Sequence, residues 1–244
     1  MIDAATEFRK NGFNDQDAAQ LAKISSIFQN VSDEAISAGD SASFLISQMI
    51  AFGDDSPEYA MHIIDSVNAV ANNFSVSSGQ MAQGLGIVAS TSSAMGNSME
   101  ETLGLMTAIT EQTRSVSKSA RGLNSIMSSL VQVLDDGSEN GKKISAVFDS
   151  INESMYDSNG TIKSGFDLLQ ILSNHWEELG TNQQLAVAEL IAGKNQINNF
   201  MALMNNFDHA VEATNTAMES QGSAIEENKR YMGGLNKMGP LKRI

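Results

Sequence analysis

The chain has 244 residues and a formal net charge of −14, from 15 Lys and Arg against 29 Asp and Glu. This charge argues against nucleic-acid binding, which needs basic residues to neutralise phosphates, and the one short basic group lies near the C-terminus at Lys237, Lys242 and Arg243. Apolar residues make up 41% of the chain, enough for a substantial core, and the lack of cysteine excludes disulfides and thiolate metal sites.

Helical patterns begin early in the chain. Asn14 is a predicted N-cap for a first helix, and a second helix is expected from about Asp33, with Gly39 as a kink. Ser56 and Pro57 suit the cap and first position of a third helix. That helix carries the clearest apolar stripe in the sequence, at Ala60, Ile63, Ile64, Val67, Val70, Ala71 and Phe74.

The middle of the chain contains two predicted capping boxes. Ser77 with Gln80 and Ser98 with Glu101 each place an N-cap hydroxyl three residues before a Glu or Gln. The helix that follows the first box is rich in small residues, which favours close helix packing. A further helix is expected over residues 117–134, with its apolar side chains on one face.

The second half alternates loops and helices. Residues 135–143 are expected to be a loop, and Asn159-Gly160 predicts a tight turn within a two-stranded ribbon or an ordered loop. Helical spacing then returns, and Thr181 with Gln184 predicts a third capping box. The last two helices are expected at residues 208–220 and 224–236.

These patterns predict an all-α fold of about nine helices, with one short β-hairpin or ordered loop near 151–163. We divide the chain into an N-terminal helical part (1–135), a loop or hairpin (136–163) and a C-terminal helical part (164–238). No signal peptide, membrane-spanning run, long coiled coil or repeat is visible. We expect the chain to be one module of a longer protein.

The pair Gly193-Lys194 raises the question of a phosphate-binding loop. That motif needs a glycine at position 188 and a hydroxyl at position 195, where the chain has Ala188 and Asn195. We therefore interpret Gly193 as a left-handed residue ending a helix, with Lys194 near the negative end of the helix dipole. The lone Gly84-Leu85-Gly86 is likewise interpreted as close helix packing rather than a dinucleotide fingerprint.

Other signs of catalysis are weak. None of the three histidines has a second histidine at i+3 or i+4 in a zincin-like frame, adjacent acids point to different sides of a helix or loop, and no nucleophile elbow occurs. Trp176, the sole tryptophan, is interpreted as a core anchor. We predict no catalytic residue, no cofactor and no metal, and hence no enzyme.

Several stretches, in this order, resemble the core region of phage tail tape-measure proteins, the TP901-1-like type of long-tailed phages and prophages. They are "SQMIAFGDDSPEYAMHIIDSVNAVANNFSVSSGQMAQGLGIVAS", "SAMGNSMEETLGLMTAITEQ", "SARGLNSIMSSL", "LLQILSNHWEELGTNQQLAVAELIAGKNQINNFMALMNNF" and "SQGSAIEENKRYM". The resemblance covers about residues 15–235. The residues assigned to the family signature are Gly53, Gly96, Glu100, Gly122, Trp176, Ala192, Gly193, Gln196 and Phe200. The chain departs from the family at Gly233-Gly234 and Gly239-Pro240, which are expected to break a helix that should continue.

The resemblance implies a structural role in tail assembly, length determination and DNA ejection. Implied partners are the tail tube protein, tail assembly chaperones and tail-tip proteins, with self-association left open, no specific nucleic acid, and membrane contact only during ejection. The implied locations are the lumen of the phage tail and, during assembly, the host cytoplasm.

Two interpretations stay open at this point. Many short helices favour a folded module for assembly or release over a stretch that measures length. The competing class is a bacterial helical interaction protein or secreted effector without catalysis, which would share the acidic composition rich in Ala, Ser and Met.

Overall fold

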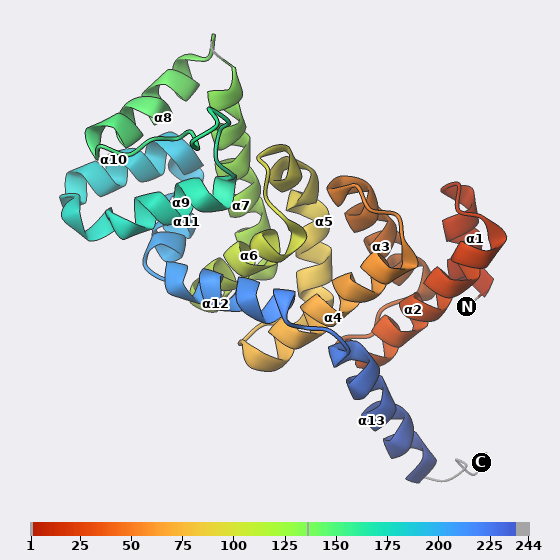
Figure 1. Ribbon diagram of the computed structural model, residues 1–244. Helices are drawn as coiled ribbons and strands as arrows, with labels where there is room; N and C mark the ends of the chain where they lie inside the picture. The colour runs from red at the N-terminus through yellow and green to blue at the C-terminus, as the bar shows by residue number, and fades with distance from the viewer. Residues whose placement is uncertain (1, 136, 238–244) are drawn as a thin grey trace. The chain divides into compact units, whose positions relative to one another are not determined.

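The computed structural model describes residues 2–135 and 137–237, and these are helical almost throughout (Figure 1). The prediction of an all-α fold is therefore confirmed for these residues. The prediction of about nine helices is too low, because this part of the chain forms thirteen α-helices and three short 3-10 helices. One unpredicted helix is α1 (Ile2–Lys10), which buries only Ala4 and Phe8 and so leaves little periodic signal.

Contacts divide the chain into two compact units. Unit 1 comprises the described residues up to Ala82 and from Thr216 onward, whereas unit 2 comprises Gln83–Asn215. Both boundaries fall inside helices, α5 (Ser78–Ala94) and α12 (Phe207–Met218). The domain boundaries predicted at residues 135 and 163 stay a prediction.

Unit 1 has a core of helices joined by well-capped turns. The Asn14 side chain accepts a hydrogen bond from the Asp17 N–H at 2.9 Å, and Ser56 accepts one from the Tyr59 N–H at 3.1 Å. Both predicted caps are therefore confirmed, and the stripe that follows Pro57 is buried from Ala60 to Val70. The complete helices of this unit are α1, α2 (Asp15–Val31), α3 (Ala38–Phe52), α4 (Pro57–Asn73) and α13 (Ser223–Lys237).

The predicted start of α3 is wrong. The helix begins at Ala38 rather than near Asp33, because the Ser37 side chain accepts the Asp40 N–H at 3.0 Å and caps it. Asp33 instead accepts hydrogen bonds from Ser78 at 2.7 Å and Ser77 at 3.1 Å, at the start of α5. Gly39 accordingly lies in the first turn of α3 and makes no kink.

Two further predictions concern the C-terminal end. Gly233-Gly234 does not break the last helix, because α13 continues to Lys237. A glycine weakens a helix by about 1 kcal/mol without forbidding it, so this pair alone could not predict a break. Gly239-Pro240, Lys242 and Arg243 lie outside the described residues.

Unit 2 contains the remaining helices. The capping box of Ser98 and Glu101 is confirmed, with both reciprocal hydrogen bonds present at 2.8 and 3.1 Å. The complete helices of this unit are α6 (Met99–Thr113), α7 (Val116–Leu130), η1 (Val131–Leu134), α8 (Glu139–Ser150), α9 (Gly165–Asn174), η2 (Trp176–Glu178), α10 (Thr181–Ala192), η3 (Lys194–Gln196) and α11 (Ile197–Met204).

The other two capping boxes differ from prediction. Ser77 accepts the Gln80 N–H, but the Gln80 side chain donates to Glu34 at 2.6 Å instead of returning to the cap. The α10 helix is capped one residue earlier than predicted, because Gly180 is the N-cap and its N–H donates to the Gln183 side chain at 3.0 Å. A polar side chain can reach several partners in the folded chain, and sequence spacing alone does not predict which of them it bonds.

The predicted loop at 135–143 is too long, because Ser138 caps α8 and the helix starts at Glu139. The segment around Asn159-Gly160 forms an ordered loop rather than a two-stranded ribbon, with one antiparallel bridge between Tyr156 and Ile162. The Asp157 carboxylate accepts the N–H groups of residues 159 and 161, each at 2.8 Å, and so closes the turn without longer strands.

Candidate functional site

The signature block near residue 193 lies where α10 passes into α11 in unit 2. Gly193 ends α10 with φ 79° and ψ 159°, so the expected positive φ is present but the residue lies outside the left-handed helical region. The preceding segment is the helix α10, not the strand that a phosphate-binding loop requires. Lys194 forms an ion pair with Glu189 at 3.6 Å, on the last turn of the same helix.

Gln196 and Gly122 both contact the buried side-chain amide of Asn199. The Asn199 side chain, 7% exposed, donates to the Gln196 side-chain oxygen at 2.5 Å and to the Lys118 carbonyl at 3.4 Å. A Cβ atom at Gly122 would lie 2.7 Å from the Asn199 Cβ atom, closer than packed atoms tolerate. Gly122 therefore lets α11 approach α7 closely enough for this amide to join the two helices.

Trp176 and Phe200 form the apolar side of the same junction. Their rings are 5.7 Å apart in an edge-to-face arrangement, with Trp176 3% exposed and Phe200 fully buried. The Gln184 side chain donates to the Trp176 carbonyl at 2.7 Å, and the Ser125 hydroxyl donates to the Ala192 carbonyl at 2.9 Å. These contacts join η2, α7, α10 and α11 into one packed cluster.

The other three signature residues lie elsewhere. Gly53 ends α3 in unit 1 with φ 77° and ψ 23°, a left-handed cap that favours glycine. Gly96 has φ 78° in the turn before α6, and Glu100 is buried in the first turn of α6. The assigned residues therefore form one cluster, which we call the α7–α11 junction (Gly122, Trp176, Ala192, Gly193, Gln196 and Phe200), and three separate positions. Their role as a family signature stays a prediction.

Sequence reasoning missed the buried polar groups that hold unit 2 together. Asn97 accepts the Phe166 N–H at 2.7 Å and donates to the Ser92 hydroxyl at 2.9 Å. Ser92 in turn lies 2.6 Å from the Thr102 hydroxyl. This network joins α5, α6 and α9, and Asn97 is 4% exposed. No sequence spacing identified it, because the bonded residues Asn97 and Phe166 lie 69 positions apart.

The pKa values of two titratable groups in unit 2, Glu101 and His175, are shifted. Burial raises the pKa of Glu101, the charges of Asp167 and Glu100 act in the same direction, and the hydrogen bond from the Ser98 N–H opposes them. Hydrogen bonds to Glu178 and Glu153 raise the pKa of His175, with nitrogen–oxygen distances of 3.0 and 3.3 Å. Glu101 serves as a cap, and His175 connects the loop after α8 to the end of α9.

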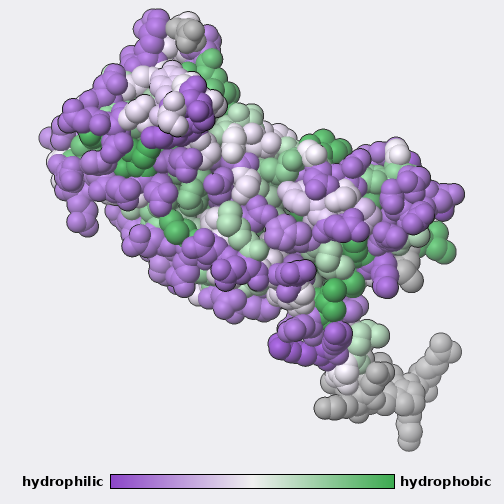
Figure 2. All heavy atoms as spheres, viewed as in Figure 1, coloured by the Kyte–Doolittle hydropathy of each residue, from purple (hydrophilic) through white to green (hydrophobic). Residues whose placement is uncertain are grey.

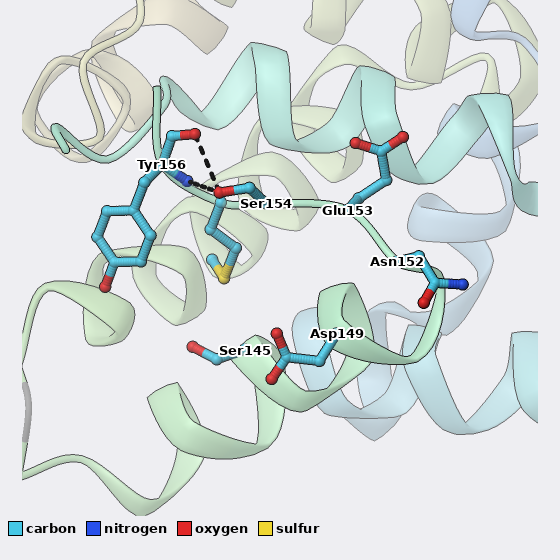
Figure 3. A pocket seen from close by; sticks show the side chains of 7 residues that line it. Ser145, Asp149, Asn152, Glu153, Ser154 and Tyr156 are labelled. Carbon is cyan, nitrogen blue, oxygen red and sulfur yellow. Dashed lines mark hydrogen bonds between the residues drawn. The ribbon is translucent and has the colours of Figure 1, made fainter. Parts of the chain in front are cut away.

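A pocket of about 360 Å³ lies between α8 and the loop that follows it (Figure 3). Ser145 and Asp149 point into it from α8, whereas Glu153 points away from Asp149. The Ser154 hydroxyl bonds the Tyr156 backbone and is thereby occupied in shaping the loop. The lining includes no histidine, so this pocket does not offer the Ser–His pair of nucleophilic catalysis.

The described residues contain neither a candidate metal cluster nor a candidate membrane span. No group of three or more His, Asp or Glu side chains there could hold a metal ion. No helix in that part of the chain is both long enough and apolar enough to cross a membrane.

The described residues form a helical protein in which the buried hydrogen bonds and ring contacts of the candidate site pack helices against one another. The model of the family described as phage-related minor tail protein matches residues 1–193, most of the chain. The chain belongs to this family of phage-related minor tail proteins, which indicates a structural role in the phage tail and association with other tail components. No solved structure matches the chain significantly.

Proposed function

We propose that this chain is a folded segment of a tape-measure protein, used in tail assembly and DNA ejection, and that length is measured elsewhere in the protein. Membership of the minor tail family and the stretches that resemble tape-measure proteins support this proposal. The same membership disfavours the alternative of an effector unrelated to phage.

The observation that carries the proposal is the return of the chain onto itself in unit 1. Asp65 of α4 accepts the Gly222 N–H at 2.9 Å and the Ala224 N–H at 2.8 Å, and so caps α13. The buried Ser66 hydroxyl donates to the Ala217 carbonyl at 3.0 Å and lies 3.2 Å from the Ser220 hydroxyl. Residues about 155 positions apart are therefore held side by side.

A ruler works differently. A continuous helix rises about 1.5 Å per residue, so that tail length follows residue number. The longest described helices here have 17 residues, or about 25 Å each. Removing residues from a compact unit destroys its core instead of shortening it in proportion.

The acidic surface also suits the proposed role. With a net charge of −14, the chain would not adhere to DNA, which has to pass through the same tube during ejection. We propose the tail tube protein, tail assembly chaperones and tail-tip proteins as its partners, and the tail lumen as its location.

The test is an in-frame deletion of unit 2, residues 83–215, in the phage, with tail lengths measured by electron microscopy. We expect either no tails, or tails of normal length that fail to infect. As part of a ruler the deleted segment would account for about 200 Å of tail. Infectious tails shortened by that amount would contradict the proposal.

A matched control is a deletion of equal length in a predicted continuous helical stretch elsewhere in the same phage protein. That control should shorten the tail in proportion to the deletion. It shows that the assay can detect ruler behaviour when it occurs.

A further inference from the structure

The second half of α13 presents side chains that the described residues of unit 1 leave partly exposed. Ala224 is fully buried, and Asn228 accepts a hydrogen bond from Asn30 at 2.9 Å, so the first half of the helix packs on α2 and α4. Tyr231 lies on the same helix face, one turn beyond Asn228, and is 45% exposed. Figure 1 shows this part of α13 extending past α2 and α4 within the unit.

Two exposed apolar side chains accompany basic ones there. Met232 is also 45% exposed, and Ile225 on the preceding turns is 37% exposed. Figure 2 shows apolar atoms along this helix among hydrophilic ones. Lys229 and Arg230 stand beside them. Arg230 forms an ion pair with Glu227 at 3.2 Å, which contributes little because it is exposed to solvent.

The charge of this end is opposite to that of the rest of the chain. Residues 229–244 hold five of the fifteen basic residues and none of the 29 acidic ones, a net charge of +5. Residues 1–228 hold the other ten basic residues and all 29 acidic ones, a net charge of −19. These two parts therefore attract each other when they belong to different copies, whereas two copies of residues 229–244 repel.

Two glycines near the exposed end of α13 also favour its stabilisation by contact with another protein. Gly233 and Gly234 have no neighbouring atom within 4 Å of the place where a Cβ would stand. Each costs an isolated helix about 1 kcal/mol, and a short uncovered helical end is marginal in water. The missing side chains leave the helix backbone open to close approach by another protein.

We propose that the α13 surface (Lys229, Arg230, Tyr231 and Met232) docks on the acidic surface of a second copy of this chain. The contact is head to tail, because the +5 charge of residues 229–244 opposes the pairing of two such ends. A head-to-tail contact uses two different surfaces, so it extends into a row or ring of copies rather than closing a two-fold dimer. Nucleic acid and anionic lipid are less suitable partners, because the −19 charge of the remaining chain repels both.

The test is sedimentation velocity of the full chain at about 0.1 mM protein, a concentration that populates weak complexes. We expect association at about 10 mM salt that is lost at about 1 M salt, where the screening length falls from about 30 Å to about 3 Å. The double variant Lys229→Glu, Arg230→Glu should weaken the low-salt association by about tenfold or more.

The matched control is Lys142→Glu, Lys143→Glu, an adjacent exposed basic pair on α8. It changes the net charge by the same amount, so it separates the α13 surface from overall charge. A second variant, Tyr231→Ala with Met232→Ala, should weaken association without changing charge. A monomeric wild-type chain at low salt, or equal effects of the two charge reversals, would overturn the proposal.

A photoreactive cross-linker placed at position 231 identifies the occupant. In a mixture of light and isotopically heavy chains, we expect mixed cross-links from position 231 to acidic regions of residues 1–228. Mixed cross-links between two copies of position 231 would show a two-fold pairing and overturn the head-to-tail contact. Binding of a short DNA duplex or of phosphatidylserine vesicles by a monomeric chain, lost on charge reversal, would assign the surface to those ligands and likewise overturn it.

Discussion

The substitution Gly122→Ala tests the α7–α11 junction directly. Its new methyl group would lie 2.7 Å from the Cβ atom of Asn199, and the side chain of Asn199 is the nearest obstacle at each of the three closest atoms. Overpacking of this kind costs about 1–3 kcal/mol, and displacing the buried amide from its hydrogen bonds costs a similar about 1–3 kcal/mol. The better helix propensity of alanine returns about 1 kcal/mol. We therefore expect a net destabilisation of about 3 kcal/mol.

The assay is urea unfolding followed by Trp176 fluorescence. Trp176 is the sole tryptophan and lies in the same junction, so its signal reports the unfolding of unit 2. The matched control is Gly86→Ala on α5, where no atom lies within 4 Å of a new Cβ. That control should stabilise the unit by about 0.5–1 kcal/mol.

A second background isolates the cause. If the amide at Asn199 is the obstacle, Gly122→Ala should cost less than about 1 kcal/mol in a chain that already carries Asn199→Gly. A Gly122→Ala variant that is as stable as Gly86→Ala would refute the close approach of α11 to α7. An unchanged cost in the Asn199→Gly background would refute the role of the amide.

Three further outcomes follow from charged groups in the two units. Hydrogen bonds to Glu178 and Glu153 raise the pKa of His175 in the folded chain. The contribution of His175 to stability is therefore complete below its unfolded pKa of about 6.5 and is lost as the pH rises through its folded pKa. In denaturant titrations across this pH range, His175→Gln should abolish that pH dependence. Glu101→Ala should lower stability by about 0.5–2 kcal/mol through loss of the capping box. Glu101→Gln keeps the cap and removes a partly buried charge, so thermal melts at neutral pH should show little loss of stability for this variant. Asp65→Ala should leave two N–H groups at the start of α13 without acceptors and lower stability by about 1–3 kcal/mol. Amide hydrogen exchange in α13 should become faster. Equal protection of the α13 amides in the wild type and the variant would argue against this cap.

Local signals in the sequence predicted local structure well. The caps at Asn14, Ser56 and Ser98 were predictable because each depends on residues within three positions along the chain. The start of α3 was not, because the competing partners of Asp33 lie about 45 residues away at the start of α5. The continuation of α13 through Gly233 and Gly234 was also missed, since a glycine lowers helix stability without setting where a helix ends.

The candidate site was predictable in part. The sequence indicated that Gly193 ends a helix and that Trp176 is buried. It gave no sign that Gly122 faces Asn199, because the two are on different helices and their contact depends on how those helices cross. The buried amides of Asn97 and Asn199 were likewise hidden, since asparagine in a sequence more often marks a turn or an exposed surface.

A disulfide between α4 and the segment before α13 tests most directly whether this chain is folded in the assembled tail. The hydroxyls of Ser66 and Ser220 lie 3.2 Å apart, and the chain has no native cysteine, so Ser66→Cys with Ser220→Cys introduces one defined pair. Cross-linking is verified on non-reducing gels, and each single variant is the control.

Tail lengths of the oxidised and reduced phage are then compared by electron microscopy. Our account predicts the same normal length in both, because the two residues are already side by side in the folded unit. An extended ruler would lose the span of 154 residues, about 230 Å, when the disulfide forms. Tails that are shortened by about that length, or that fail to assemble, only when the disulfide is present would contradict a folded module.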